Sequence, residues 1–215
     1  MDKANKLAVL RESGVIAIMR VGSSGRLIEA ADAIRRGGVR AIEVTMTTPD
    51  ALDVVGEASK RYKNDVIFGA GSVLDAETAR AAILAGATFV VSPALDLAMI
   101  ELCNRYAVPV IPGVLTPTEA VAALQAGVSM VKLFPAEIGG PRMVAALLAP
   151  LPHLEIVPVG GVDLENAAAY IKAGAIALGV GSSLVSERLL EAKNMAELTR
   201  RAAAFIEAVK LSRAQ

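Results

Sequence analysis

The chain has 215 residues, of which 54% are hydrophobic and 20% are charged, a composition that allows a large core and excludes a disordered protein. Lysine plus arginine and aspartate plus glutamate number 22 each, and this zero formal charge, without any basic run, excludes nucleic acid as an expected partner. The single cysteine, Cys103, excludes an internal disulfide, and we expect it to be a buried, inert thiol.

The start of the chain and its apolar runs argue against a membrane protein. Residues 1–6 are too polar for a signal peptide, and no apolar run is long enough to span a bilayer. We therefore expect no membrane partner, and a cytoplasmic enzyme or binding protein.

Short apolar runs alternate with helical segments along the chain, as is typical of strands that are buried on both faces. The predicted strands cover 14–19, 39–45, 66–72, 89–93, 108–113, 131–135, 155–159 and 175–181. Four helices are predicted at 3–12, 95–106, 141–148 and 196–211.

Five more helices are predicted from an N-terminal capping residue. The capping residues are Ser23 or Ser24, Thr48 with Pro49 in the first turn, Asp75, Thr116 and Asp163. The strongest start is Thr116-Pro117-Thr118-Glu119, which is a capping box with proline at the first helical position.

Glycines that stop helices recur along the chain with a near-constant spacing. Gly38, Gly86, Gly127 and Gly174 are separated by 48, 41 and 47 residues, and each interval holds two strand–helix units. We therefore predict an α/β fold, a single (β/α)8 TIM barrel domain over 1–215 with a short N-terminal helix. The alternative is a doubly wound open sheet, but the glycine-rich dinucleotide turn after the first strand is missing.

Lys132 lies within an apolar strand that Pro135 closes. Lysine is almost never fully buried without a partner or a task. Burial would lower its pKa and make the amine a candidate nucleophile for a carbonyl, through a Schiff base. The alternative is a lysine at a strand end whose ammonium reaches water.

Glu43 is a second charged residue in an apolar strand. Its carboxyl should have a raised pKa unless it is paired, which suits a general acid/base near neutral pH. The alternative is an internal salt bridge, for which Lys132, on a strand across the barrel, is a candidate partner. Both interpretations can hold together.

Glycines follow the last two predicted strands. Gly160-Gly161 ends the seventh, and Gly181-Ser182-Ser183 follows the eighth. In TIM barrels the loops after these strands usually bind phosphate, and glycine lets backbone N–H groups approach an anion. Two ordinary glycine turns are the alternative.

Other residues at the strand ends can complete a substrate pocket. Arg20 can clamp an anion or form a surface ion pair, and Ser72 offers a hydroxyl or caps a helix. Pro93 and Phe134 would form apolar walls. His153 is the only histidine and falls in a loop at the far end, so we expect no metal site and no Ser-His or Cys-His pair.

Taken together, these segments resemble the 2-keto-3-deoxy-6-phosphogluconate aldolase / 4-hydroxy-2-oxoglutarate aldolase family. The matching pieces are Glu43-Val44-Thr45, Gly69-Ala70-Gly71-Ser72-Val73, Ser92-Pro93, Pro112-Gly113-Val114, Val131-Lys132-Leu133-Phe134-Pro135-Ala136-Glu137, Pro158-Val159-Gly160-Gly161-Val162 and Gly179-Val180-Gly181-Ser182. The lysine motif is highly specific, whereas the glycine pairs alone are weak. The resemblance implies a class I aldolase, a homotrimer of barrels that needs no metal or cofactor and releases pyruvate and glyceraldehyde 3-phosphate.

The resemblance also implies a role for each matching residue. Lys132 would form the Schiff base and Glu43 would be the acid/base. The remaining positions divide into a pyruvate pocket of Arg20, Ser72, Pro93 and Phe134 and a phosphate site of Gly160, Gly161, Gly181 and Ser182.

The chain departs from the family pattern at three positions. Thr47 stands where many members have Arg, and Ser72 where many have Thr. Val159 stands where gluconate-type members usually have Thr, so the sugar configuration stays open.

Two other classes of function are alternatives. A phosphosugar epimerase or isomerase on the same fold would keep the phosphate loops but would not need a buried lysine. A non-catalytic binding or assembly module would not need both Glu43 and Lys132.

Overall fold

The computed structural model describes residues 1–22, 24–63 and 65–214. Its strands are β1 Val15–Met19, β2 Ala41–Thr45, β3 Ile67–Gly71, β4 Phe89–Val91, β5 Val110–Ile111, β6 Gly113–Val114, β7 Met130–Leu133, β8 Glu155–Pro158 and β9 Leu178–Val180. Its helices are α1 Lys3–Ser13, α2 Leu27–Arg36, α3 Ala51–Tyr62, α4 Ala76–Ala85, α5 Leu97–Arg105, α6 Pro117–Gln125, the 3-10 turn η1 Ala136–Ile138, α7 Gly140–Leu148, α8 Ala167–Lys172, α9 Glu187–Glu191 and α10 Met195–Arg213.

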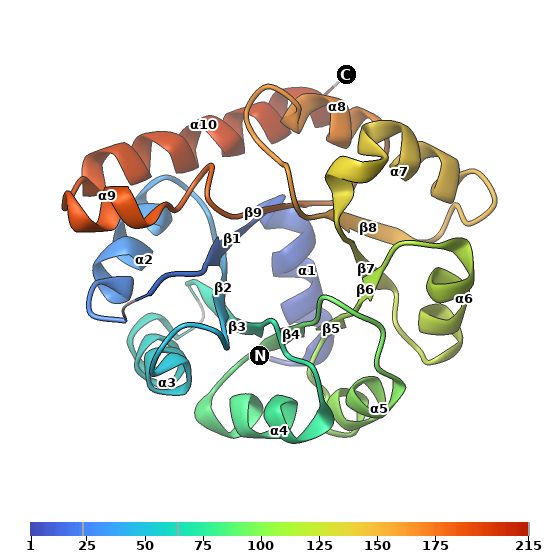
Figure 1. Cartoon of the computed structure of the whole chain (residues 1–215), viewed down its shortest axis with the longest axis horizontal. Helices are drawn as coiled ribbons and strands as arrows, with labels where there is room; N and C mark the ends of the chain where they lie inside the picture. Colours follow the sequence, from blue (N-terminus) through green and yellow to red (C-terminus); the bar gives the residue numbers. More distant parts are fainter. Residues whose placement is uncertain (23, 64, 215) are drawn as a thin grey trace.

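The strands form a curled parallel sheet with helices outside it (Figure 1). One ladder has the order β5-β4-β3-β2-β1-β9 and a second has the order β6-β7-β8. Their edges approach each other at β8 and β9, where Val159 pairs with Gly179 and the Ile176 N–H donates to the Ile156 carbonyl at 2.9 Å. Because β1 to β5 follow one another without a reversal of order, the alternative of a doubly wound sheet is wrong.

The fifth predicted strand is divided into β5 and β6 by Pro112. Proline has no N–H to donate to a neighbouring strand. Its carbonyl still accepts a hydrogen bond from the Lys132 N–H at 2.8 Å, which ties this segment to β7.

Alternate residues of each strand pack in two separate cores, as the two-residue period of a strand requires. The outer core lies between the sheet and the helices and contains Val15, Ala17 and Met19 of β1. The inner core lies on the concave face and contains Ile16 and Ile18, together with side chains from most other strands. By the same alternation, Glu43 and Lys132 belong to the inner face.

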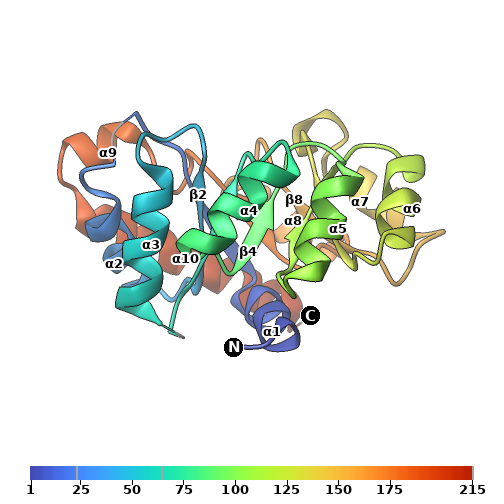
Figure 2. The same ribbon diagram turned by 90° about the horizontal axis from the view of Figure 1, so that it is seen from below.

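Helix α1 closes one end of the sheet (Figure 2). Its Val9 and Leu10 belong to the inner core, so this helix fills the space inside the strands at their amino ends. Among the described residues, α1 therefore covers the inner face at the amino ends of the strands, which leaves the carboxyl ends as the side for access. None of the helices formed by the described residues combines the length and apolar character needed to cross a bilayer.

Two of the predicted helix caps are confirmed. The Asp75 side chain accepts the Thr78 N–H at the start of α4. Thr116 and Glu119 form the predicted capping box of α6, with Pro117 in its first turn.

Ser24 and Thr48, which were predicted to cap α2 and α3, do not cap these helices. Ser23 lies outside the described residues, and Ser24 donates to Asp50 at 3.2 Å while Arg26 caps α2. Asp50 takes the N-cap position of α3, because the Thr48 hydroxyl is engaged with Thr45 and the Val21 N–H.

Two corrections concern the C-terminal part of the chain. Asp163 accepts the N–H groups of Glu165 and Asn166, so it caps a turn ahead of α8, whose N-cap is Asn166. Helix α9 was not predicted, because its five residues are too few for a periodic pattern.

The capping box gives a prediction about stability. Thr116→Ala removes the side-chain acceptor of the Glu119 N–H and should lower the free energy of unfolding by about 1 kcal/mol in urea titrations. The matched control is Ser186→Ala, since Ser186 caps α9 without a side-chain hydrogen bond. Equal losses for the two variants would contradict a special role of the capping box.

Candidate active site

Lys132 is buried on the inner face of β7 and is only 2% exposed. Its Nζ lies 4.7 Å from the centre of the Phe134 ring, so the ammonium contacts an aromatic face instead of reaching water. The alternative of a lysine that extends into solvent is therefore wrong. Burial lowers the pKa of Lys132, the Glu43 carboxylate raises it in part, and Arg20 lowers it again. The lowered pKa increases the fraction of neutral amine.

Glu43 is buried on the inner face of β2 and is 1% exposed. Its Oε1 accepts no hydrogen bond within the described residues, and no ion pair joins Glu43 to Lys132 there. Burial raises the pKa of Glu43, and the charges of Lys132 and Arg20 oppose this shift. The salt bridge that was an alternative for this pair is not formed, yet each charge still shifts the pKa of the other.

The neighbouring strand explains how the Glu43 side chain fits. Glu43 pairs in register with Gly69 on β3, and its carboxyl lies over Gly71, where a Cβ would collide with Oε1, Cδ and Cγ. Gly71 therefore keeps open the volume that the carboxyl occupies.

Arg20 follows β1 and is exposed, with Nη2 3.5 Å from the Ser72 hydroxyl, a long hydrogen bond. Ser72 has a φ of 56°, a left-handed conformation that an L residue adopts at some cost in energy. This arrangement brings Arg20 and Ser72 together at the rim above Glu43. The structure therefore brings together two of the residues predicted for the pyruvate pocket, Arg20 and Ser72.

Two predicted binding residues lie apart from the main cleft. Thr47 is exposed and its hydroxyl shares a hydrogen bond of 3.0 Å with Thr45. Pro93 is half-buried, and a Cβ on Gly113 would collide with its carbonyl, so this segment packs tightly against the start of β6. Neither residue lines the cleft described next.

A cleft of about 570 Å³ opens at the carboxyl ends of the strands. Seven of its lining residues were predicted from the sequence: Arg20, Phe134, Val159, Gly160, Gly161, Gly181 and Ser182. Phe134 lines the cleft and also contacts the Lys132 amine, so one side chain separates the cleft from the buried lysine.

The two glycine loops present unused backbone donors to this cleft. Gly160 and Gly161 have φ values of 94° and 70°, which favour glycine, and a Cβ at Gly181 would meet no atom within 4 Å. Within the described residues, the N–H groups of Gly161, Val162, Ser182 and Ser183 donate no hydrogen bond. Unpaired N–H groups that converge on one cavity are suited to bind an anion.

The sequence analysis missed several residues of the cleft. They are Ile18, Val162, Asp163, Gly179, Val185, Ser186 and Glu187, whereas Ser183, which also lines the cleft, lies in a loop that was predicted to bind phosphate. Glu187 accepts the Gly22 N–H at 3.1 Å and so links α9 to the loop after β1. Their position directly after the glycine loops was a usable signal for most of them, but α9 itself was not predicted.

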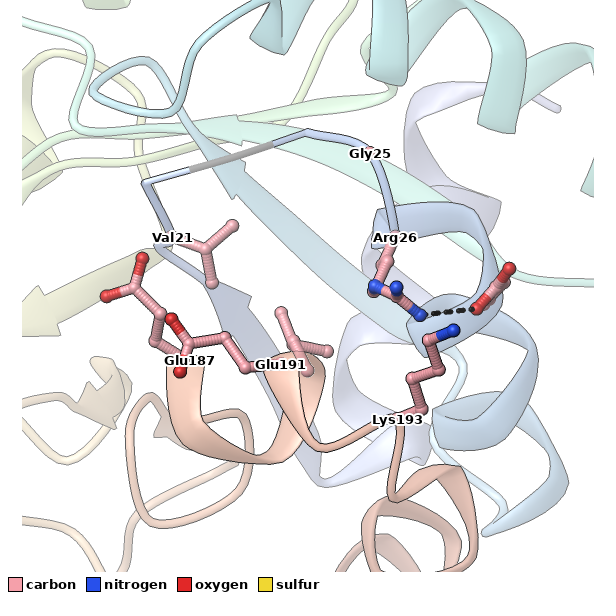
Figure 3. Close-up of a pocket in the computed structure, with 8 residues that line it drawn as sticks. Val21, Gly25, Arg26, Glu187, Glu191 and Lys193 are labelled. Carbon is pink, nitrogen blue, oxygen red and sulfur yellow. Dashed lines mark ion pairs between the residues drawn. The ribbon is translucent and has the colours of Figure 1, made fainter.

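A second hollow, of about 490 Å³, lies between α9 and the start of α2 (Figure 3). Glu187 and Glu191 lie on its α9 side, and Arg26 and Lys193 lie opposite them. Arg26 pairs with Glu29 at 3.9 Å, and the lining of this hollow has three carboxylates, Glu29, Glu187 and Glu191, against the two cations Arg26 and Lys193. The buried pair of Glu43 and Lys132 lies elsewhere.

The described residues include no group of three or more His, Cys, Asp and Glu side chains placed to hold a metal ion. His153 is exposed, as expected for a loop at the amino ends of the strands. Cys103 is buried, and burial raises the pKa of its thiol to about 11, as expected for an unreactive cysteine.

Comparison with known proteins gives one family. The family model described as KDPG and KHG aldolase matches residues 7–201. A 2-dehydro-3-deoxy-phosphogluconate aldolase of Haemophilus influenzae is 33% identical over 202 residues, which cover 94% of this chain and 95% of that protein. A 2-dehydro-3-deoxy-6-phosphogalactonate aldolase of Escherichia coli is 32% identical over 197 residues, 91% of this chain and 94% of that protein.

A solved structure agrees with both relatives. The KDPG aldolase of Legionella pneumophila, with pyruvate captured as a covalent carbinolamine intermediate, superimposes with a TM-score of 0.87 at 28% identity, and covers 93% of this chain and 97% of that one. The match of the family model over nearly the whole chain, the buried lysine and the cleft with two glycine loops agree, and the chain belongs to the KDPG and KHG aldolase family.

Proposed function

We propose that this chain is a class I aldolase that reversibly cleaves 2-keto-3-deoxy-6-phosphogluconate, or its galactonate epimer, to pyruvate and glyceraldehyde 3-phosphate. Cleavage of 4-hydroxy-2-oxoglutarate to pyruvate and glyoxylate is a second activity of the same site. The observation that carries the proposal is the burial of Lys132 and Glu43, with the Lys132 amine against Phe134, a residue of the cleft that has unused N–H donors. A phosphosugar epimerase or isomerase, the alternative, would have no use for this lysine.

Lys132 supplies the covalent step. Its neutral amine adds to the C2 ketone, and loss of water gives an iminium ion, which accepts the electrons of the C3–C4 bond. Glu43 takes the proton of the C4 hydroxyl, directly or through water, and the aldehyde leaves. The enamine that remains is protonated at C3 with help from Glu43, and hydrolysis frees pyruvate and the amine. Acid–base assistance of this kind contributes roughly 10²- to 10⁴-fold.

Binding residues divide between the two ends of the substrate. Arg20 and Ser72 bind the carboxylate, with Pro93, Phe134 and Thr47 nearby. The phosphate binds at Gly160, Gly161, Gly181 and Ser182, a placement that the free N–H groups of these loops support.

The proposal extends to the whole molecule. Residues 1–215 form one domain, and the two ladders close into a (β/α)8 barrel, supported by the pairing of Val159 with Gly179 and the hydrogen bond between Ile176 and Ile156. The chain works as a homotrimer, as the resemblance to the family implies, and in the cytoplasm, as the polar start of the sequence favours.

Metal independence also belongs to the proposal. The iminium ion serves as the electron sink, so exhaustive EDTA treatment should leave the cleavage rate unchanged. A rate that returns only on addition of zinc or magnesium would contradict it.

The decisive experiment traps the intermediate on Lys132. Borohydride with pyruvate should label a peptide that contains Lys132, and Lys132→Met should abolish both labelling and cleavage. Lys172→Met is the control, since Lys172 is exposed on α8. Mass mapping of the label to Lys172 in the unsubstituted protein would overturn the assignment.

The coupling between the two buried groups predicts a pH effect. The Glu43 carboxylate raises the pKa of Lys132, so Glu43→Gln should lower this pKa further and move the midpoint of pyruvate labelling to lower pH. Labelling is measured by mass spectrometry across pH, with Glu191→Gln, on the outer helix α9, as control. A midpoint that stays in place or rises would show that Glu43 does not act on the lysine.

The side chain at position 159 predicts substrate preference. Val159 is 8% exposed, lines the cleft and immediately precedes the glycine pair. A threonine hydroxyl there could bond a C4 hydroxyl of one configuration only, so Val159→Thr should raise the gluconate-to-galactonate ratio of kcat/KM by about three- to tenfold. Assays of both substrates on both proteins measure this ratio, and an unchanged ratio means that Val159 does not contact C4.

A further inference from the structure

Side chains donate hydrogen bonds to the backbone carbonyls of the loop that contains Gly160 and Gly161. The Ser183 hydroxyl donates to the Val162 carbonyl at 2.6 Å, and the Asn166 amide donates to the Gly161 carbonyl at 2.7 Å. The carbonyls of these loops are thus engaged by side chains, whereas their N–H groups at Gly161 and Ser183 are unused within the described residues.

Arg201 on α10 completes this support. Its Nη1 donates to the Ser183 carbonyl at 3.1 Å, and its Nε donates to Glu197 at 2.9 Å. Ser183 lines the substrate cleft and also a separate hollow of about 390 Å³ that contains Arg200, Arg201 and Phe205. The loop is therefore a thin wall with the cleft on one side and the Arg201 guanidinium on the other.

The charged side chains give neither side of this wall a net positive charge. Glu197 is shared by Arg200 and Arg201, whose hydrogen bonds lower its pKa to about 2, so two cations face one carboxylate. Asp163 and Glu165 are the acidic side chains that also border this hollow. In the cleft, the lining side chains of the described residues include one cation, Arg20, and two carboxylates, Asp163 and Glu187. A phosphate dianion would gain from further positive charge close to the loop.

We infer that Arg201 is a positioning residue of the phosphate subsite: through the Ser183 carbonyl it fixes the loop whose N–H groups bind the phosphate, without touching the substrate. This inference rests on the proposed function, and it adds a residue from the C-terminal helix to a site otherwise built from the strand ends. Arg200, its neighbour on α10, shares Glu197 but makes no contact with Ser183, which provides a matched comparison.

The test compares a reaction that uses the phosphate with one that does not. Arg201→Ala should raise KM for 2-keto-3-deoxy-6-phosphogluconate by about tenfold, the loss expected for one charge-assisted hydrogen bond, with kcat changed less than about twofold. The concentration of pyruvate that gives half-maximal borohydride trapping should stay the same, because pyruvate carries no phosphate. Arg200→Ala should change neither quantity, and Arg201→Lys should recover part of the loss.

The outcomes distinguish a role of Arg201 in the phosphate subsite from a role in folding, from a general charge effect and from failure of the proposed function. If Arg201→Ala changes KM and the pyruvate concentration for half-maximal trapping by the same factor, Arg201 only maintains the fold. If Arg200→Ala and Arg201→Ala have equal effects, the cause is a general charge effect. Either result overturns the inference. If Arg201→Ala does not fold, the same KM measurements are made on Arg201→Gln and Arg201→Lys. The lysine variant should have the lower KM for 2-keto-3-deoxy-6-phosphogluconate, because only lysine keeps a charged donor. Absence of pyruvate trapping in the unsubstituted protein would instead refute the proposed function.

Discussion

The burial of two opposite charges on the inner face of the sheet is the constraint on which the site depends. A lone ammonium or carboxylate in an apolar interior is strongly disfavoured, and each of these two groups shifts toward its neutral form. Lys132 and Glu43 are too far apart for an ion pair, so neither fully cancels the charge of the other. The result is an amine that loses its proton readily and a carboxyl that can give and take one.

The rest of the fold keeps water away from this pair on most sides. Helix α1 fills the amino end of the inner core with Val9 and Leu10, and the Phe134 ring lies against the lysine amine at the other end. Gly71 leaves the volume that Glu43 needs. Within the described residues, the glycine loops and Arg20 define a cleft at the carboxyl ends of the strands, and its Phe134 ring contacts the lysine amine.

The loops of that cleft depend on contacts from outside it. Side chains at the start of α8 and on α10 donate hydrogen bonds to carbonyls of the glycine loops. The backbone N–H groups of Gly161 and Ser183, two residues that line the cavity, donate no hydrogen bond within the described residues. A phosphate site made of backbone N–H groups carries little charge of its own, so it depends on the geometry of the loops, which the Arg201 hydrogen bond to the Ser183 carbonyl helps to fix.

The sequence by itself determined the alternation of strands and helices, the placement of Glu43 and Lys132 in apolar strands, and the glycine loops, because these follow from local signals: apolar runs, capping boxes and glycine stops. Thr116 formed its capping box as predicted, since all the groups involved lie within four residues. Thr48 and Ser24 did not cap their helices, because partners distant in the chain, Val21 and Asp50, bind their hydroxyls instead. Only the tertiary structure decided that Lys132 is buried and forms no ion pair with Glu43, that Glu187 borders the cleft, and that Arg201 reaches the Ser183 carbonyl. These features depend on how far apart separate elements lie after packing, and the order of residues along a chain does not contain that distance.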